Sequence, residues 1–399
     1  MESLPNAPPQ AVHAVGMALR RNLLIGVISF LTLVDLFAAQ AILPTLTKVF
    51  GVTPSEMGLA VNASTLGMAV AGIAVALAAR GLNRRMGIWI ALALLSIPTI
   101  GLALTNDLAT FAALRIAQGL CMATAFTLTM AYLAEHCSAS DSASALAAYV
   151  TGNVASNLFG RMLSASLTDT FGLDVNFFVF AALNLLGAAV VYLGLNGVDP
   201  MTPVAAQSSS VFGAWARHIQ TPRLRAAFAI GFTILFAFIG TFTYVNFELQ
   251  SPAIGLSSMQ LGLVYLIFIP ALFTTPLAGA AASAFGVRPV FWSALGVAVI
   301  GLPLLLSQDL RMILAGLALV AAGTFFAQAA ATGFVSRAAL TDRGAASGLY
   351  LASYYVGGLT GTALLGPLYQ AFGWTACVAA IGAVLTIAMT FAGRLRMPE

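Results

Sequence analysis

Three charged side chains stand inside long apolar stretches of the sequence: Asp35, Arg115 and Arg161. A charge at membrane depth costs roughly 2.5–3.5 kcal/mol on insertion scales, so such a residue persists where it is paired or functional. A buried carboxyl escapes this cost by binding a proton, whereas a nearby guanidinium favours its charged form. We therefore interpret Asp35 as a proton-coupling residue that Arg115 tunes. A structural ion pair, or an aspartate that caps a helix break, is the alternative.

Arg161 belongs to a polar helix face. Asn153, Asn157 and Arg161 follow one another at intervals of four residues, which places them on one side of a helix. The face either binds substrate, or meets the opposite half of the protein as a gate, or only makes hydrogen bonds between helices. Small residues at the same spacing suit a close approach between helices, and they are Gly152, Ser156, Gly160 and Ser164.

Other polar and aromatic side chains in the apolar stretches are candidates for a substrate cavity, because such cavities are mostly apolar with a few polar groups. The candidates are Asn62, Gln118, Tyr244, Asn246, Gln328, Tyr354 and Tyr355. Four phenylalanines would suit an apolar or aromatic substrate, and they are Phe232, Phe236, Phe238 and Phe242. The alternative is that these side chains face lipid or the protein core.

The elements that position these residues follow from the composition. Of the 399 residues, 60% are hydrophobic and 8% are charged, whereas soluble domains carry about 25% charged residues. The chain must therefore face lipid, and a bilayer core takes roughly 20 apolar residues per helix. We predict an all-α membrane protein with twelve transmembrane helices. The predicted spans are 22–46, 57–80, 86–105, 108–134, 143–168, 176–195, 224–247, 258–282, 287–307, 310–335, 344–369 and 374–393.

With an even number of spans, both chain ends lie on one side of the membrane. That side would carry 13 of the 17 Lys and Arg residues and the other side 2, so the positive-inside rule places both termini in the cytoplasm. The predicted organisation is a cytoplasmic, disordered tail (1–21), an N-terminal half (22–195), a cytoplasmic linker (196–223), a C-terminal half (224–393) and a cytoplasmic tail (394–399).

The chain also repeats itself at an offset of 201 residues. The informative matches are Asp141 with Asp342, Tyr149 with Tyr350, Gly160 with Gly361, and the dipeptide Phe171–Gly172 with Phe372–Gly373. Spans five and eleven are therefore expected to be equivalent helices in two pseudo-symmetric halves of six helices each. Transporters that work by alternating access are built in this way, with a site between the halves.

These segments resemble the major facilitator superfamily over essentially the whole chain. Residues 114–120 resemble its fourth-helix motif, with Arg115, Gln118 and Gly119 in place, and residues 276–290 resemble the loop motif after helix eight. The first-half copy of that loop has Ala79 where an aspartate is usual. The resemblance implies an inner gate in which loop arginines face two aspartates, and its residues are Arg80, Arg84, Arg288, Asp141 and Asp342.

Three segments further resemble the drug:proton antiporter branch of the acriflavine-sensitivity type: 151–161, 323–335 and 349–361. In the second of them, Gln328 stands where that branch has a histidine. The resemblance implies efflux of a small amphipathic or drug-like molecule, with the proton gradient as energy source and no cofactor or metal.

Other classes fit the sequence less well. All three histidines fall in predicted tails or loops, so a Ser–His site at membrane depth is not expected. No phosphate-binding GxxxxGK[ST] motif and no Lys/Arg-rich run occur, which argues against an ATPase and against nucleic-acid binding. We predict a monomeric, non-enzymatic transporter of the cell inner membrane. The alternative is a proton-coupled importer of a small organic anion, with Arg115 and Arg161 as anion ligands.

Overall fold

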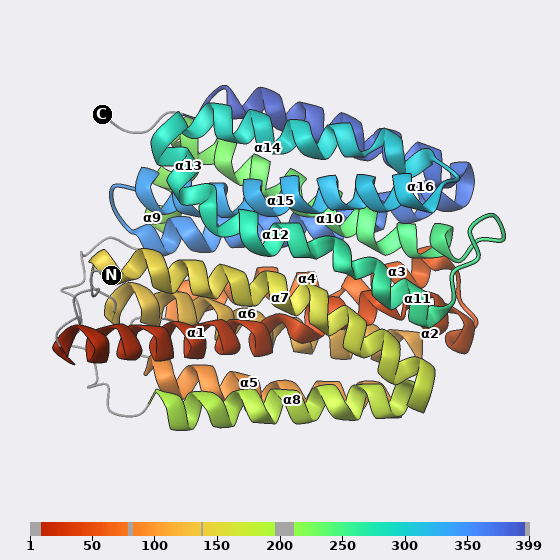
Figure 1. The fold of residues 1–399 in the computed structure, drawn as a ribbon, viewed down its shortest axis with the longest axis horizontal. Coiled ribbons are helices and arrows are strands. Elements are labelled where there is room, and N and C mark those ends of the chain that lie inside the picture. Colours follow the sequence, from red (N-terminus) through yellow and green to blue (C-terminus); the bar gives the residue numbers. More distant parts are fainter. Residues whose placement is uncertain (1–8, 79–82, 137–138, 196–210, 396–399) are drawn as a thin grey trace, which may run out of the picture.

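The computed structural model describes residues 9–78, 83–136, 139–195 and 211–395, and every regular element in those ranges is helical. Most helices run along one direction in two groups (Figure 1). The start of α1 (Pro9–Ala41) and the end of α16 (Arg343–Ala392) lie at the same end of the bundle. We call this the terminal end, and the opposite end the distal end.

The N-terminal half contains α1, α2 (Leu43–Phe50), α3 (Pro54–Asn62), α4 (Ser64–Ala78), α5 (Arg84–Leu104), α6 (Leu108–His136), α7 (Ala139–Phe171) and α8 (Leu173–Gly194). The C-terminal half contains α9 (Val211–Gln220), α10 (Pro222–Leu249), α11 (Ser258–Val264), η2 (Tyr265–Phe268), α12 (Ile269–Thr274), η3 (Thr275–Leu277), α13 (Ala278–Phe285), α14 (Val287–Gly301), η4 (Pro303–Leu306), α15 (Leu310–Ala338) and α16.

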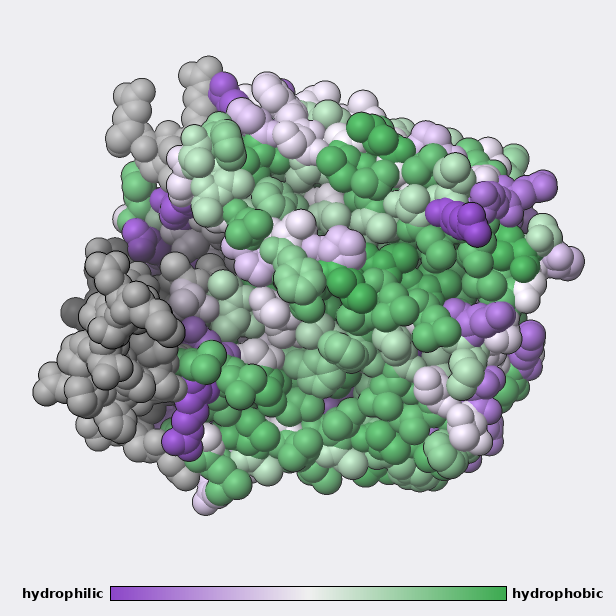
Figure 2. All heavy atoms as spheres, viewed as in Figure 1, coloured by the Kyte–Doolittle hydropathy of each residue, from purple (hydrophilic) through white to green (hydrophobic). Residues whose placement is uncertain are grey.

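The helices are long and apolar enough for a membrane protein. Within the described ranges, ten helical segments meet the length and hydropathy needed to cross a bilayer. One of these ten, α16, holds two helices joined at Gly373, and α7 is a further helix of 33 residues that lies along α1. The arrangement is therefore consistent with the predicted twelve spans. Figure 2 shows a broad apolar band on the visible face, with polar residues toward both ends.

The repeated Phe–Gly dipeptide has a structural reason. Gly172 and Gly373 both have positive φ, at 91° and 74°, a conformation that glycine adopts without steric cost. Gly172 separates α7 from α8, and Gly373 separates the two helices within α16. The same dipeptide thus makes the turn between the fifth and sixth predicted spans and between the last two.

Three predicted spans are interrupted toward the distal end. Span 22–46 breaks at Ile42 between α1 and α2, and span 57–80 breaks after Asn62, whose side chain donates to the Gly58 carbonyl four residues earlier. Such back-bonding bends helices. Span 258–282 contains the 3₁₀ turn η2 just before Pro270, which lacks a backbone N–H.

Two helices begin inside segments that were predicted to lie outside the membrane. α1 begins at Pro9, inside the expected disordered tail 1–21, and α9 lies within the expected linker 196–223. The expectation of a disordered tail is therefore wrong from residue 9 onward. Charged and polar residues had marked both segments as extramembrane, but that property does not decide whether a segment is helical.

The small-residue stripe of α7 packs against α1. A Cβ on Gly160 would lie 3.0 Å from the Val34 carbonyl oxygen, and a Cβ on Gly152 would lie 2.2 Å from that of Gly26. In the other half, a Cβ on Gly361 would lie 2.7 Å from the Phe236 carbonyl oxygen. The close approach predicted at Gly160 and Gly361 is confirmed, and both contacts lie within a half rather than between halves.

Candidate functional site

Asp35 lies in the interior of the N-terminal half. Its side chain is 3% exposed. Its Oδ1 accepts hydrogen bonds from three helices, and the donors are Thr99 Oγ1 of α5 (3.2 Å), Gln118 Nε2 of α6 (3.2 Å) and Asn184 Nδ2 of α8 (3.4 Å). Its Oδ2 is buried and has no hydrogen-bond partner among the described residues. One carboxyl oxygen is thus fully bonded, while the other is unpaired.

Arg115 is fully buried beside it, and all five of its N–H groups are used. The acceptors are the carbonyl oxygens of Val61 (2.7 Å), Asp35 (3.1 Å) and Leu36 (3.2 Å), Gln118 Oε1 (2.7 Å) and Ser64 Oγ (3.1 Å). Arg115 therefore binds the backbone at Asp35 and reaches the carboxyl through Gln118, which accepts from Arg115 and donates to Asp35 Oδ1. We call Asp35, Thr99, Arg115, Gln118 and Asn184 the Asp35 cluster.

Close helix contact lets Arg115 reach these carbonyl groups. A Cβ on Gly119 would lie 1.9 Å from the Ser64 carbonyl oxygen, and a Cβ on Gly67 would lie 2.0 Å from that of Ile116. Both distances are far too short for any side chain, so α4 and α6 touch backbone to backbone here. The fourth-helix motif thus combines a clamping arginine with the glycine that brings the neighbouring helix within its reach.

Arg161 lies farther toward the distal end, between the halves. It is fully buried, and its Nη2 donates to Gln40 Oε1. Its Nε and Nη1 have no partner in the part of the chain that the structure describes. The guanidinium carbon is 4.6–5.7 Å from five aromatic ring centres, which belong to Phe37, Phe238, Phe242, Tyr265 and Phe268. We call these rings the aromatic box.

Hydrogen bonds join the two halves around this box. Gln40 Nε2 donates to Asn62 Oδ1 (2.6 Å), and Asn62 Nδ2 donates across the interface to Thr243 Oγ1 (3.1 Å). From the C-terminal half, Asn246 Nδ2 donates to the Gln40 carbonyl (2.8 Å) and its Oδ1 accepts from the Tyr265 hydroxyl (2.6 Å). The halves are thereby held together toward the distal end.

A central cavity lies between the halves, on the terminal side of the aromatic box. Four of the predicted candidates line it, and they are Asn153, Gln328, Tyr354 and Tyr355. The α1 residues that line it are Leu33, Leu36 and Phe37. Asp35 projects toward α5, α6 and α8 instead, so its carboxyl lies behind the cavity wall.

Four other predicted cavity residues lie elsewhere. Asn157 is fully buried and donates to the Asn153 carbonyl (3.3 Å), while Gln118 belongs to the Asp35 cluster. Asn62 bridges the halves. Tyr244 stacks on Tyr369 with ring centres 5.5 Å apart, and its hydroxyl donates to the Thr362 carbonyl (2.9 Å).

The predicted inner gate lies at the terminal end. Arg288 Nε donates to the Leu395 carbonyl (2.9 Å), and Arg84 begins α5 directly after its cap Asn83. Arg80 and the side chain of Asp141 lie outside the described part of the chain.

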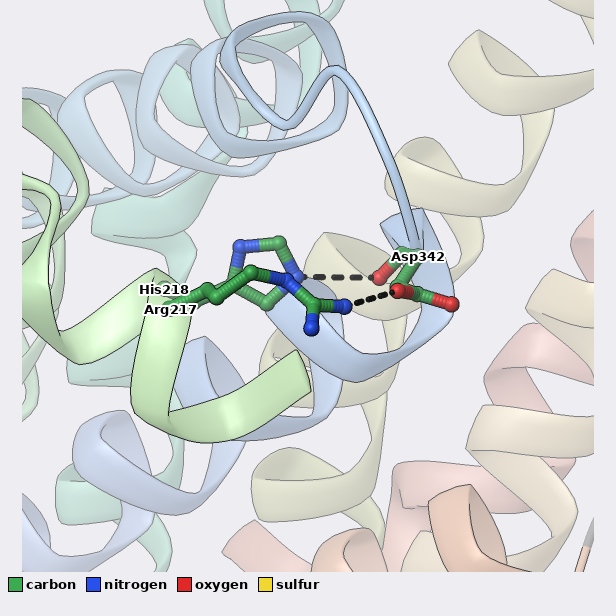
Figure 3. Close-up of polar contacts among 3 residues, drawn as sticks. All are labelled: Arg217, His218 and Asp342. Carbon is green, nitrogen blue, oxygen red and sulfur yellow. Dashed lines mark hydrogen bonds and ion pairs between the residues drawn. The ribbon is translucent and has the colours of Figure 1, made fainter. Parts of the chain in front are cut away.

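Asp342 is bound by the linker helix α9. Arg217 Nη2 donates to Asp342 Oδ2 at 2.8 Å, and His218 Nε2 lies 3.3 Å from the Asp342 carbonyl oxygen (Figure 3). Asp342 also has a left-handed φ of 46°, which is uncommon for a residue other than glycine. The linker contact of this predicted gate residue did not emerge from the sequence.

The sequence did not indicate several residues that contact the buried charges. Gln40 and Asn184 are amides inside apolar spans, so a search for such amides would have found them. Thr99 gives no comparable signal, because a threonine in a span bonds its own helix, here the Leu95 carbonyl at 2.8 Å. Tyr265 gives none either, since aromatic residues near span ends are common.

The fold and these buried charges define a class: an α-helical membrane transporter built from two similar halves. The chain matches the Major Facilitator Superfamily over residues 25–269 and 249–399, and it belongs to that family. The drug:proton antiporter branch stays a prediction.

Two relatives cover most of the chain. The uncharacterized MFS-type transporter YybF of Bacillus subtilis is 24% identical and covers 93% of each chain. The inner membrane transport protein YnfM of Escherichia coli is 27% identical, over 90% of this chain and 86% of its own. A solved bacterial homolog of the human lysosomal transporter Spinster, in an inward-facing and occupied conformation, superposes with a TM-score of 0.75 at 17% identity, over 98% of each chain.

Proposed function

We propose that this transporter is proton-coupled and exports a small amphipathic molecule in exchange for protons, as a monomer in the inner membrane with both termini in the cytoplasm. The observation that carries the proposal is the unpaired Oδ2 of Asp35. A carboxylate oxygen without a hydrogen-bond partner is costly in a membrane interior, so protonation of this carboxyl changes its energy strongly. That sensitivity is what proton coupling requires.

The Asp35 cluster offers a route from the proton to the substrate. Arg115 holds the backbone of α1 at Asp35 and Leu36, and Leu36 lines the central cavity. A change in the charge of the carboxyl alters its bonds to Gln118, and Gln118 bonds Arg115. Protonation would therefore shift α1 relative to α6, and with it the wall of the cavity. Such coupling needs no direct contact between the proton and the substrate.

The cavity lining suits an amphipathic molecule. Phenylalanine and leucine side chains form most of it, with polar atoms from Asn153 and Gln328 and the ring of Tyr354. The hydrogen bonds between the halves lie on the distal side of this cavity. With the termini in the cytoplasm, a carrier held in this way is closed to the outside.

Gating at the terminal end is part of the proposal. Arg80, Arg84 and Arg288 would approach Asp141 and Asp342 when the inner side closes. Only the second-half loop keeps the turn glycine, Gly286, which has a φ of 85°. We therefore expect Arg288→Ala to reduce transport more than Arg84→Ala at matched expression, and equal losses would contradict this asymmetry.

A second candidate function is favoured by Arg161. A buried guanidinium with two unpaired nitrogens is suited to an anion, so a proton-coupled importer of a small organic anion is the alternative. The two functions differ in the direction in which protons move relative to substrate.

The sign of substrate-driven proton flux tests the proposal. A thermal-shift screen at two pH values supplies a ligand, and proteoliposomes loaded with the pH dye pyranine then receive a gradient of that ligand. Exchange predicts that protons move opposite to the ligand, and protein-free liposomes are the control. Protons that move with the ligand would support the importer, and no proton movement would rule out both coupled mechanisms.

A further inference from the structure

We propose that Arg161 is the anion-binding site for the substrate, that it takes an aromatic or apolar carboxylate, and that the aromatic box covers it in this state. The inference rests on the proposed transport function and adds the charge class of the molecule carried. Of the two buried arginines, it assigns the binding of the ligand's carboxylate to Arg161 and excludes Arg115.

In the described membrane-spanning helices, the buried positive and negative charges do not balance. Among the described residues of the membrane-spanning helices, the buried charged side chains are Asp35, Arg115 and Arg161. There are thus two buried cations and only one buried acid in these residues, and that acid, Asp35, lies in the same cluster as Arg115. Arg161 has no carboxylate partner, and a buried charge without a partner is costly. Aromatic rings compensate a cation only in part.

The two buried arginines also differ in their capacity to form further hydrogen bonds. All five N–H groups of Arg115 are bonded, so it has no capacity to bind a ligand. Arg161 has one hydrogen bond, to Gln40, and its Nε and Nη1 are free to donate. A guanidinium with free N–H groups is the preferred protein partner of a carboxylate, which it binds through two parallel hydrogen bonds.

Separation of the two halves would make Arg161 accessible to a ligand. Phe238 and Phe242 lie on α10, and Tyr265 and Phe268 form the ends of η2, so four of the five rings belong to the opposite half. Gln40 and Phe37 lie on α1, in the same half as Arg161. When the halves separate at the distal end, Arg161 keeps Gln40 and loses four rings. An anion in the opened space would replace them.

The ring environment indicates the rest of the ligand. Phe37 and Phe238 contact Arg161 and also line the central cavity, so they connect the two. A molecule with a carboxylate at Arg161 would place its apolar part between these phenylalanines. This geometry favours an aromatic carboxylate over a sugar or a cationic drug.

Calorimetric titration of the purified protein tests the site with three probes of one ring size: benzoate, benzyl alcohol and benzylamine. We expect benzoate to bind at least about tenfold more tightly than either other probe, as a charge-assisted bond adds that much or more. Arg161→Gln should lower benzoate affinity by about tenfold or more and leave benzyl alcohol unchanged, while Arg161→Lys should retain part of it.

Two results would overturn the proposal. If benzoate binds the unaltered protein no better than benzyl alcohol, the site does not select anions, and this comparison holds even where a variant fails to fold. If Arg161→Gln binds benzoate as tightly as the unaltered protein does, the anion lies elsewhere. Both measurements are made without a pH gradient, so their failure would leave proton coupling at Asp35 intact.

Discussion

The two buried arginines differ in how their surroundings satisfy them. Arg115 lies within the N-terminal half and uses all five N–H groups, three of them on backbone carbonyl groups. Arg161 lies between the halves, uses one N–H group and is otherwise surrounded by rings. Arg115 thus holds helices of one half together, whereas Arg161 lies at the interface between the two halves.

The difference between the two arginines follows from which of their contacts persist throughout the transport cycle. Alternating access moves the halves relative to each other, so bonds within a half persist while bonds between halves break. A saturated guanidinium suits the first position, because its bonds are never exchanged. A guanidinium held by rings suits the second, because cation–π contacts are short-range and leave its N–H groups free for another partner.

The largest effect is expected for Arg115→Gln. Four of the five hydrogen bonds of Arg115 join α6 to other helices. Hydrogen bonds between membrane helices contribute about 0.6 kcal/mol each, so loss of these four amounts to roughly 2.4 kcal/mol. The variant should unfold in detergent at a markedly lower temperature, as measured by thermal shift. An unchanged melting temperature would show that Arg115 does not clamp α1, α4 and α6 together.

Gly160→Leu comes next, because Gly160 adjoins Arg161 in sequence and contacts Val34, the neighbour of Asp35. A Cβ here would lie 3.0 Å from Val34, so added bulk should cost roughly 1–3 kcal/mol and slow transport without preventing insertion. Gly296→Leu, at a glycine with open space around its Cβ position, is the matched control. Full transport in Gly160→Leu would show that the close contact between Gly160 and Val34 is not needed for transport.

Arg161→Gln should change stability little, by under about 1 kcal/mol, because loss of ring contacts is offset by removal of an unpaired buried charge. Thermal shift beside Arg115→Gln measures the difference directly. A loss as large as that of Arg115→Gln would mean that the aromatic box is a structural clamp, and the contrast between the two arginines would fail.

The smallest effect concerns Asp107, which caps α6, the helix that carries Arg115. The Thr110 backbone N–H and hydroxyl both donate to its carboxylate and lower the pKa of Asp107 below its ordinary 3.8. The cap therefore stabilises the protein above that pH and is lost as pH falls through the lowered value. Asp107→Ala should lower the melting temperature slightly at pH 6 and not at the most acidic pH the protein tolerates. An equal difference at both would exclude a carboxylate cap.

The sequence predicted the family, the helical fold and the contact between the segments around Asp35 and Arg115, because hydropathy and a local motif carry that information. It also predicted the close approach at Gly160. It did not predict Gln40, Asn184 or Tyr265 as partners, since each becomes one only when distant helices meet. The Arg217–Asp342 pair escaped for the same reason: the sequence offered several cytoplasmic arginines, and the position of α9 selects one.

The helix breaks near Ile42 and Tyr265 could have been predicted in part from the sequence. Pro44 and Pro270 lie beside two of the three breaks, and a proline removes a helix hydrogen bond. Asn62 breaks its helix through its own side chain, which nothing in the hydropathy pattern distinguishes from a polar cavity residue. That the Asp35 cluster and the aromatic box lie near bent helices could therefore be seen only in the three-dimensional fold.

The central claim is that Asp35 binds the transported proton, and ligand accumulation in proteoliposomes under an imposed pH gradient tests it most directly. Asp35→Asn mimics the protonated carboxyl and has no proton to release, so it should fold, bind ligand and exchange it, yet fail to concentrate it. Asp107→Asn, the same change outside the membrane spans, should concentrate ligand as the unaltered protein does. If Asp35→Asn still concentrates ligand with the same pH dependence, Asp35 is structural and the proton binds elsewhere.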